Sequence, residues 1–373
     1  MKKIFFVLSI ALFSTYVNAQ SFKNDTLATD PYWLKLGHYR GATLGGWKSE
    51  VDRAEFFLSP IGKTSPLDEL EATIAAFSGK NTDPKTTQSR CRFPARYKWL
   101  KTKIKNNWPA LNCPELQTWQ KIINPKGVTL VFPTAFMNSP SSMFGHTLLR
   151  IDAKDQTRHK ELLAFAVNFA AEPDGSDNAA MYALKGLIGS YPGKFSLMPY
   201  YKKVREYNDL ESRDIWEYKL NLSELQVELI LLHLWELQSA TFDYFFIDEN
   251  CSYQLLSLLQ VAREGLELSS QFDYHVIPSD TVTVLRDAGL LKVPEYRPAS
   301  GTRLLHYSKQ LNNAELQATK ALMQGEFPDE SFSIESQVKI YEMAYEWLNY
   351  RFYNERLLRE EMAPLLTTML IAR

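Results

Sequence analysis

The chain has 373 residues, of which 45% are hydrophobic and 13% aromatic. Its 42 basic and 43 acidic residues give a formal net charge of −1 without a basic stripe, which argues against a nucleic-acid-binding protein. This length predicts two or three structural units, and the aromatic content suits a large core or an apolar groove.

Residues 1–19 have the features of a secretion signal. Lys2 and Lys3 form a positively charged start, and an apolar run follows from residue 4 to residue 13. The small residues that end at Ala19 predict cleavage after that position. No later stretch approaches the roughly 20 uninterrupted apolar residues that a membrane span needs. We therefore expect an exported, periplasmic protein.

Residues 20–114 are predicted to form a mostly helical N-terminal domain. The clearest helix begins at Ser65 and Pro66, because a capping serine followed by proline at the first helical position is a typical start. Residues 81–89 are rich in polar side chains and are predicted to be a loop that leads to Cys91.

The chain has three cysteines, Cys91, Cys113 and Cys251. Cys91 and Cys113 are 22 positions apart, and two nearby cysteines are expected to pair in an oxidising compartment. Such a loop stabilises the fold by about 3 kcal/mol on chain-entropy reasoning. This pairing leaves Cys251 as a free thiol, although the sequence also allows either of the other cysteines to pair with it.

From residue 115 to residue 280 the pattern predicts an α+β domain, and residues 281–373 are predicted to be a helical C-terminal region. Strands are expected at residues 127–132, 144–151, 162–169, 194–198 and 215–220. Ser223 and Gln226 predict a capping box at the start of a long helix.

Cys251 stands where an aromatic, strand-like run at residues 242–247 changes to a helical pattern. The first turn of a helix favours an anion and lowers a thiol pKa. A cysteine there is therefore a candidate nucleophile, and His146 is a candidate base. The alternative is a buried, inert cysteine.

Four motifs together resemble the periplasmic domain of the Lnb lipoprotein N-acyltransferases. They are Ser141-Ser142-Met143-Phe144-Gly145-His146-Thr147, Phe165-Ala166-Val167-Asn168-Phe169-Ala170, Lys185-Gly186-Leu187-Ile188-Gly189-Ser190-Tyr191 and Asn250-Cys251-Ser252-Tyr253. Residues 90–97 resemble a segment of longer relatives. His146 precedes Cys251 by 105 positions, which resembles the order in circularly permuted papain-like enzymes.

The resemblance implies an α+β fold with a permuted papain-like (NlpC-like) core between helical N-terminal and C-terminal regions. It implies a thiol acyltransferase that moves an acyl chain from a phospholipid to the N-terminal amine of a lipoprotein, or to another amine, through an acyl-Cys251 intermediate. Contact with a membrane surface is expected, and no cofactor is. The main alternative is an NlpC-like cell-wall amidase or peptidase, and a third is a catalytically dead binding protein.

Asn168 is the candidate for the third catalytic residue. If its strand pairs antiparallel with the strand predicted for His146, the Asn168 amide can orient the imidazole. Additional candidates for oxyanion or substrate contacts are Ser142, Gly145, Asn250 and Tyr253. The remaining histidines show no metal-ligand spacing and are interpreted as isolated structural or surface residues, and these are His38, His159, His233, His275 and His306.

Overall fold

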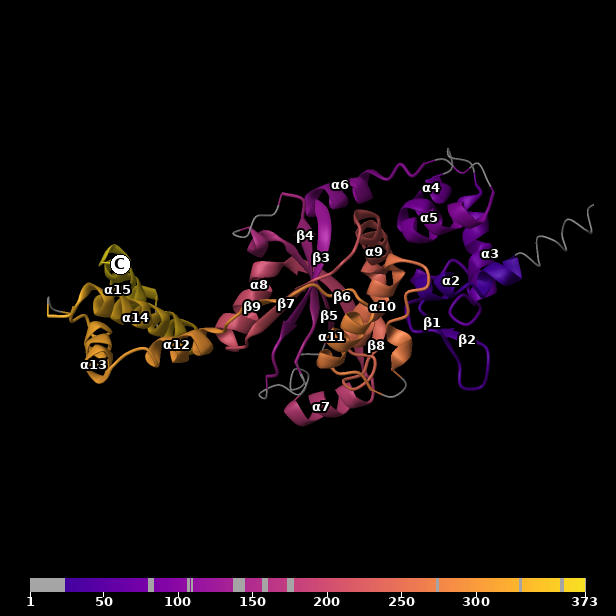
Figure 1. Ribbon diagram of the computed structural model, residues 1–373. Coiled ribbons are helices and arrows are strands. Elements are labelled where there is room, and N and C mark those ends of the chain that lie inside the picture. Colours follow the sequence, from indigo (N-terminus) through magenta and orange to yellow (C-terminus); the bar gives the residue numbers. More distant parts are fainter. Residues whose placement is uncertain are drawn as a thin grey trace, which may run out of the picture.

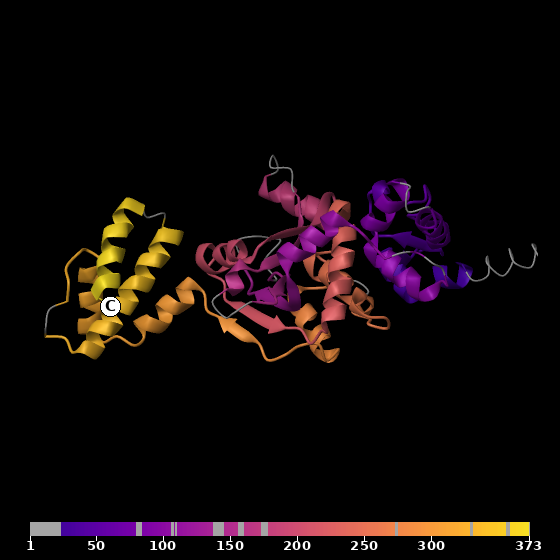
Figure 2. The same ribbon diagram turned by 90° about the horizontal axis from the view of Figure 1, so that it is seen from above.

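The computed structural model describes residues 24–79, 84–105, 108, 110–136, 145–155, 160–172, 178–272, 275–328, 331–355 and 359–372. The predicted secretion signal lies outside these residues. Three units follow one another along the molecule: a mostly helical N-terminal unit, a central α+β unit and a helical C-terminal bundle (Figures 1 and 2). Among the described residues, no helix is long and apolar enough to cross a membrane.

A short helix covers residues 24–28 of the N-terminal unit, and four further helices of the unit start with proline. This placement suits proline because the first helical N–H needs no partner within the helix. The helices are α2 (Pro31–Leu36), α3 (Pro66–Phe77), α4 (Pro84–Arg92) and α5 (Pro94–Lys103). The other elements of the unit are β1 (Tyr39–Gly41), β2 (Trp47–Ser49) and the 3-10 turn η1 (Ala54–Phe56).

The loop predicted for residues 81–89 is wrong from residue 84 onward, where α4 forms. The sequence of α4 has no apolar stripe, and its tertiary contact is instead polar. The buried Arg90 side chain donates hydrogen bonds to the backbone oxygens of Phe77 and Gly79 at the end of α3. A hydrophobic periodicity therefore could not reveal this helix.

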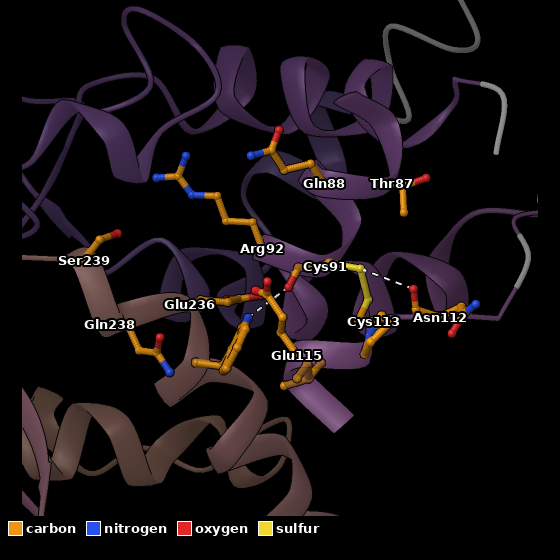
Figure 3. Close-up of a pocket in the computed structure, with 13 residues that line it drawn as sticks. Thr87, Gln88, Cys91, Arg92, Asn112, Cys113, Glu115, Glu236, Gln238 and Ser239 are labelled. Atoms are coloured by element: carbon orange, nitrogen blue, oxygen red, sulfur yellow. Dashed lines mark hydrogen bonds between the residues drawn. A yellow bond between two sulfur atoms is a disulfide. The ribbon is translucent and has the colours of Figure 1, made fainter. Parts of the chain in front are cut away.

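Cys91 and Cys113 form the predicted disulfide, and Cys251 is a buried free cysteine. The bond joins α4 to the start of α6 (Pro114–Ile123). It lines a cavity of about 560 Å³ between the N-terminal unit and the end of α9 (Glu224–Glu236), as Figure 3 shows.

The central unit is built on a seven-stranded antiparallel sheet, which makes the protein a mixed α+β fold as predicted. The strand order is β8-β6-β5-β4-β3-β7-β9. The strands are β3 (Pro125–Pro133), β4 (Leu148–Ala153), β5 (Phe165–Ala171), β6 (Tyr191–Pro199), β7 (Ile215–Lys219), β8 (Phe242–Tyr244) and β9 (Glu295–Arg297). That this core is a permuted papain-like one stays a prediction from the resemblance.

Two strand predictions place their start too early. The strand expected from residue 144 begins at Leu148, so His146 precedes β4 instead of lying on it. The strand expected from residue 162 begins at Phe165, after the 3-10 turn η2 (Glu161–Leu163). The apolar character of both segments continues outside the hydrogen-bonded strands, which is why sequence alone misplaces these boundaries.

Alternating residues of the sheet pack into two separate cores. Val167 and Phe169 of β5 belong to the larger one, together with apolar residues of α9 and α10 (Cys251–Leu259). Ala166 belongs to the smaller one, where it meets Tyr200 and Tyr207. Tyr200 starts α8 (Tyr200–Val204), and Tyr207 lies on the π-helical segment η3 (Arg205–Leu210).

The remaining segments of the central unit surround the sheet. They are α7 (Ala179–Leu187), the 3-10 turns η4 (Leu237–Ser239), η5 (Gln260–Ala262) and η6 (Ser269–Gln271), and α11 (Pro278–Asp287). The predicted capping box is present, because the Ser223 side chain accepts from the Gln226 N–H and the Gln226 side chain accepts from the Ser223 N–H.

The C-terminal bundle consists of α12 (Ser300–Ser308), α13 (Asn313–Leu322), α14 (Ile334–Asn354) and α15 (Arg359–Ala372). It has its own apolar core, with Leu322 and Leu348 fully buried. It contacts the central unit at η3, where Arg303 donates to the Asn208 side chain and Asn354 donates to the Asp209 backbone oxygen.

Candidate active site

Cys251 is the first residue of α10, as the sequence predicts, and it is only 2% exposed. Asn250 caps the helix, because its side-chain oxygen accepts from the N–H groups of Ser252 and Tyr253 at 2.9 and 3.4 Å. The Asn250 amide nitrogen donates to the backbone oxygens of Phe246 and Val276. These contacts fix the helix start and hold the thiol at its positive end.

The imidazole of His146 lies between Cys251 and Asn168. Its Nε2 is 2.8 Å from the Asn168 side-chain oxygen. The His146 side chain is also hydrogen-bonded to the Cys251 thiol. An amide oxygen only accepts, so Nε2 carries a proton and Nδ1 faces the thiol. Asn168 is on β5, which pairs antiparallel with β4. The structure thus brings together the three residues that the sequence proposes as catalytic.

The electrostatics of the pair favour a thiolate and an imidazolium. Burial opposes ionisation of Cys251, but the His146 charge and hydrogen bond, together with bonds from Thr147, lower its pKa from 9.0 to about 7. Burial likewise opposes protonation of His146, and the Cys251 thiolate and the bond to Asn168 outweigh it and raise the His146 pKa. Each group supplies the charge that keeps the other ionised.

Thr147 and Tyr244 also contact the thiol, and the sequence analysis assigned neither to the site. The Thr147 N–H donates to Sγ, and its hydroxyl is 3.9 Å from Sγ and 3.3 Å from the Ser252 hydroxyl. The Tyr244 hydroxyl interacts with the Cys251 side chain and accepts from the Cys251 N–H. Burial, followed by the thiolate charge, raises the Tyr244 pKa well above its usual value. The sequence signals that point toward these residues are that Thr147 directly follows His146 and that Tyr244 lies within the aromatic run 242–247.

The π-helical segment η3 places Tyr207 against the outer side of His146. The two ring centroids are 5.9 Å apart, and Tyr207 is itself covered by Arg213, whose guanidinium carbon lies 4.8 Å from the ring centroid. π-helical turns are uncommon and often occur at functional sites. Here the turn places an aromatic ring against the imidazole.

The other predicted site residues have different surroundings. Gly145 has a φ of +98°, and a Cβ there would lie 3.2 Å from the Phe132 ring, so only glycine fits comfortably before His146. The Tyr253 hydroxyl donates to Glu50 and accepts from Arg40 of the N-terminal unit. Its hydroxyl therefore contacts residues of that unit. Ser142 lies outside the described residues.

The interpretation of His38 and His233 as isolated residues is wrong. Their Nε2 atoms are 3.0 Å apart in the interior, and His233 Nδ1 is 3.0 Å from Glu236. Glu236 also accepts from the N–H groups of Ala95 and Arg96. We call His38, Glu69, Arg96, His233 and Glu236 the interdomain network, because they connect the N-terminal unit to α9. His233 and Glu236 are three positions apart on α9, but the other members are too far away in sequence for a pattern to reveal their contacts with this pair.

Among the residues that the structure describes, the carboxylates of Glu161, Glu217 and Glu295 lie close enough together to hold a metal ion. Glu217 is already hydrogen-bonded to Arg150 and Arg297, and Glu161 is 3.6 Å from Arg297. The arginines compensate these two charges, and we assign no cofactor or metal role to the group. The cavity in Figure 3 also lies apart from the chemistry, because its lining includes neither Cys251 nor His146.

The fold and these contacts define a mixed α+β domain with a buried, hydrogen-bonded thiol–imidazole pair. Residues 115–288, just under half of the chain, match the family model described as the Lnb N-terminal periplasmic domain. The flanking units match two families described as domains of unknown function, DUF7843 at residues 25–103 and DUF7842 at residues 294–373. No curated protein and no solved structure gave a match.

Proposed function

We propose that this protein is a periplasmic thiol acyltransferase that moves an acyl chain from a phospholipid to an amine such as a lipoprotein N-terminus. The observation that carries the proposal is the buried Cys251–His146 pair within an Lnb domain, with the thiol pKa lowered to about 7. A thiolate at neutral pH is the nucleophile that acyl transfer requires.

The first half of the reaction forms an acyl-enzyme. The Cys251 thiolate attacks the ester carbonyl of the donor, and the carbonyl oxygen becomes an oxyanion. We assign the Tyr244 hydroxyl as its donor, since this hydroxyl interacts with the Cys251 side chain. When the intermediate collapses, the C–O bond breaks and the His146 imidazolium gives its proton to the departing alcohol. The products are a lysophospholipid and an acyl-Cys251 thioester.

The second half transfers the chain to the acceptor. A neutral amine attacks the thioester carbon, His146 takes the proton from the amine nitrogen, and the C–S bond breaks to regenerate the thiolate. An α-amino group has a pKa of roughly 7.7–8.0, so a sizeable fraction is neutral near pH 7.5. Asn168 holds Nε2 protonated throughout and keeps Nδ1 directed at the reacting atoms.

The test is to trap the acyl-enzyme. The purified protein is incubated with phosphatidylethanolamine and examined by intact-protein mass spectrometry, and we expect an acyl adduct on Cys251 that hydroxylamine removes. Cys251→Ala should show none. Cell-wall muropeptides form the second arm, because the same pair of residues could serve an NlpC-like amidase. Cys251-dependent muropeptide cleavage without any lipid adduct would replace the acyltransferase proposal with that alternative.

A further inference from the structure

Helix α7 exposes the side chains that a helix of a folded domain usually buries. Met181, Leu184, Leu187 and Ile188 are 42%, 53%, 51% and 60% exposed. We call these four residues the α7 face. Leu184 follows Met181 by three positions and precedes Ile188 by four, which is the spacing of one side of a helix. Large apolar side chains gathered on one exposed helical face indicate an interaction surface.

The opposite side of α7 is the one that packs on the domain. The buried Gly186 lies against Phe246 so closely that a Cβ would be 2.2 Å from the Phe246 ring, and its backbone oxygen accepts from the Phe246 N–H. The Tyr182 ring centroid is 5.3 Å from that of Phe246. The orientation of the helix is therefore fixed by close contacts, and these contacts turn the α7 face outward.

The α7 face lies beside the candidate active site. Phe246 precedes Cys251 by five residues, and its ring contacts that of Tyr244, whose hydroxyl interacts with the thiol. Ile247, the next residue, is itself 49% exposed. Figure 1 shows α7 at the end of the sheet next to β8, which leads into the segment before α10. Helix α7 itself and the rings of Phe246 and Tyr244 thus lie between the exposed face and the nucleophile.

We propose that the α7 face is a membrane-docking surface that seats the active site on a phospholipid bilayer. Residues 179–187 contain no carboxylate and one cation, Lys185, which suits an interface with zwitterionic and anionic lipid headgroups. Aliphatic side chains insert readily into the acyl region, whereas a protein interface core is enriched in aromatic residues, methionine and arginine, and only Met181 of the α7 face is of one of these types. This inference rests on the proposed function, since a phospholipid donor is presented to the enzyme in a bilayer.

The experiment measures binding of the whole protein to sonicated vesicles of phosphatidylethanolamine and phosphatidylglycerol in equal parts. We expect Leu184→Ser combined with Leu187→Ser to weaken vesicle partitioning by about tenfold or more, because two large apolar side chains no longer leave water. The matched control is Ile334→Ser with Val338→Ser on α14, two residues that are 83% and 50% exposed. The control should bind as the unmodified protein does.

Equal vesicle binding by the α7 variant and its control would overturn the proposal. Wild-type dimerisation that the α7 variant abolishes, without a difference in vesicle binding, would also overturn it and assign the surface to a second copy of the chain. An NBD label on Leu184→Cys, in a Cys251→Ala background, should increase in fluorescence on addition of vesicles, whereas a label on Val338→Cys should not.

Two further measurements separate this proposal from the proposed function. Cys251→Ala should bind vesicles normally, because it alters the chemistry and not the surface. The α7 variant should form the acyl-enzyme from a water-soluble short-chain thioester at the unmodified rate, and from vesicle lipid more slowly. If no variant or substrate ever yields an acyl adduct while vesicle binding still depends on the α7 face, the docking surface stands and the acyltransferase proposal fails.

Discussion

Two buried histidine clusters in this molecule have opposite electrostatic behaviour. His146 is buried beside Cys251, and its pKa is raised. His38 and His233 are buried against each other in the interdomain network. Burial, followed for His38 by the neighbouring His233 and Arg96, holds the pKa of His38 well below its usual value. Burial, followed by Arg96, lowers the pKa of His233 to about 3.

Burial opposes protonation of all three histidines, but the Cys251 thiolate and Asn168 outweigh it at His146, whereas the Arg96 charge adds to it at His38 and His233. A consistent neutral arrangement exists for the network: the Ser257 hydroxyl donates to His38 Nδ1, His38 Nε2 donates to His233 Nε2, and His233 Nδ1 donates to Glu236. His146 instead faces an acidic thiol, and proton transfer between the two creates an ion pair. The His38–His233 cluster is therefore suited to structure and the His146–Cys251 pair to chemistry.

The largest effect we expect is on the chemistry of the His146–Cys251 pair. Cys251→Ala should lower the acyl-transfer rate about 10⁴-fold or more, as the loss of a nucleophile does in other covalent enzymes. The free energy of unfolding should change by no more than about 1 kcal/mol, because His146 can become neutral once the thiolate is absent. Rate assays and urea titrations of the same preparation measure both. Residual activity within tenfold of the unmodified protein would remove Cys251 from the reaction.

The interdomain network should respond in the opposite way, with a large effect on the free energy of unfolding. Glu69→Ala leaves the fully buried Arg96 without its carboxylate, which is 2.6 Å away, and should destabilise the fold by about 3–5 kcal/mol. Glu228→Ala is the matched control, since its partner Lys98 and Glu228 itself are half-exposed, and it should cost less than about 1 kcal/mol. Urea titration compares the two. Equal stabilities would show that Arg96 finds another partner.

Titration of the Cys251 thiol tests how strongly its ionisation is coupled to that of His146. In the unmodified protein the thiolate absorbance near 240 nm should rise with a midpoint at about pH 7, because the Cys251 pKa is lowered to that value. His146→Ala removes the cation and leaves only burial as the main influence, so the midpoint should move above pH 9. Cys251→Ala supplies the baseline. An unchanged midpoint in His146→Ala would show that the helix terminus, and not the imidazole, acidifies the thiol.

The smallest effect should come from the orienting residue. Asn168→Ala removes the acceptor of the Nε2 proton and should lower kcat/KM by about 10- to 100-fold, because the imidazole loses its fixed direction. Asn168→Asp keeps an acceptor at the same place and should recover most of the activity. A loss as complete as that of Cys251→Ala would instead give Asn168 a direct part in the reaction.

The sequence contains enough information to predict the chemical groups of the site. Cys251 is marked by a change of periodicity at a helix start, and His146 and Asn168 by motifs that resemble a family. Tyr244 and Thr147 were not assigned to the site, because their contact with the thiol depends on how β8 and the segment before β4 are placed, and their positions in the sequence do not show this placement. The exposure of the α7 face was not predicted either, because an apolar periodicity does not say which side of a helix packs against the core.

The interdomain network marks the limit of such predictions. Its members come from residues 38 to 236, and every local pattern around them is an ordinary helix or turn. What makes them a unit is the docking of the N-terminal unit on α9, which tertiary packing alone determines. The α+β class and the helical C-terminal region follow from periodicity, whereas the order of the seven strands needs the long-range pairings.

The position of the disulfide along the chain has a consequence for biogenesis. An exported polypeptide crosses the membrane from its N-terminus, so Cys91 and Cys113 reach an oxidising compartment well before Cys251, which follows Cys113 by 138 residues. We expect Cys91 and Cys113 to pair while Cys251 has not yet crossed the membrane. When Cys251 arrives, no competing thiol remains, and folding then encloses it. We therefore expect the order of the cysteines in translocation to protect the nucleophile from scrambling.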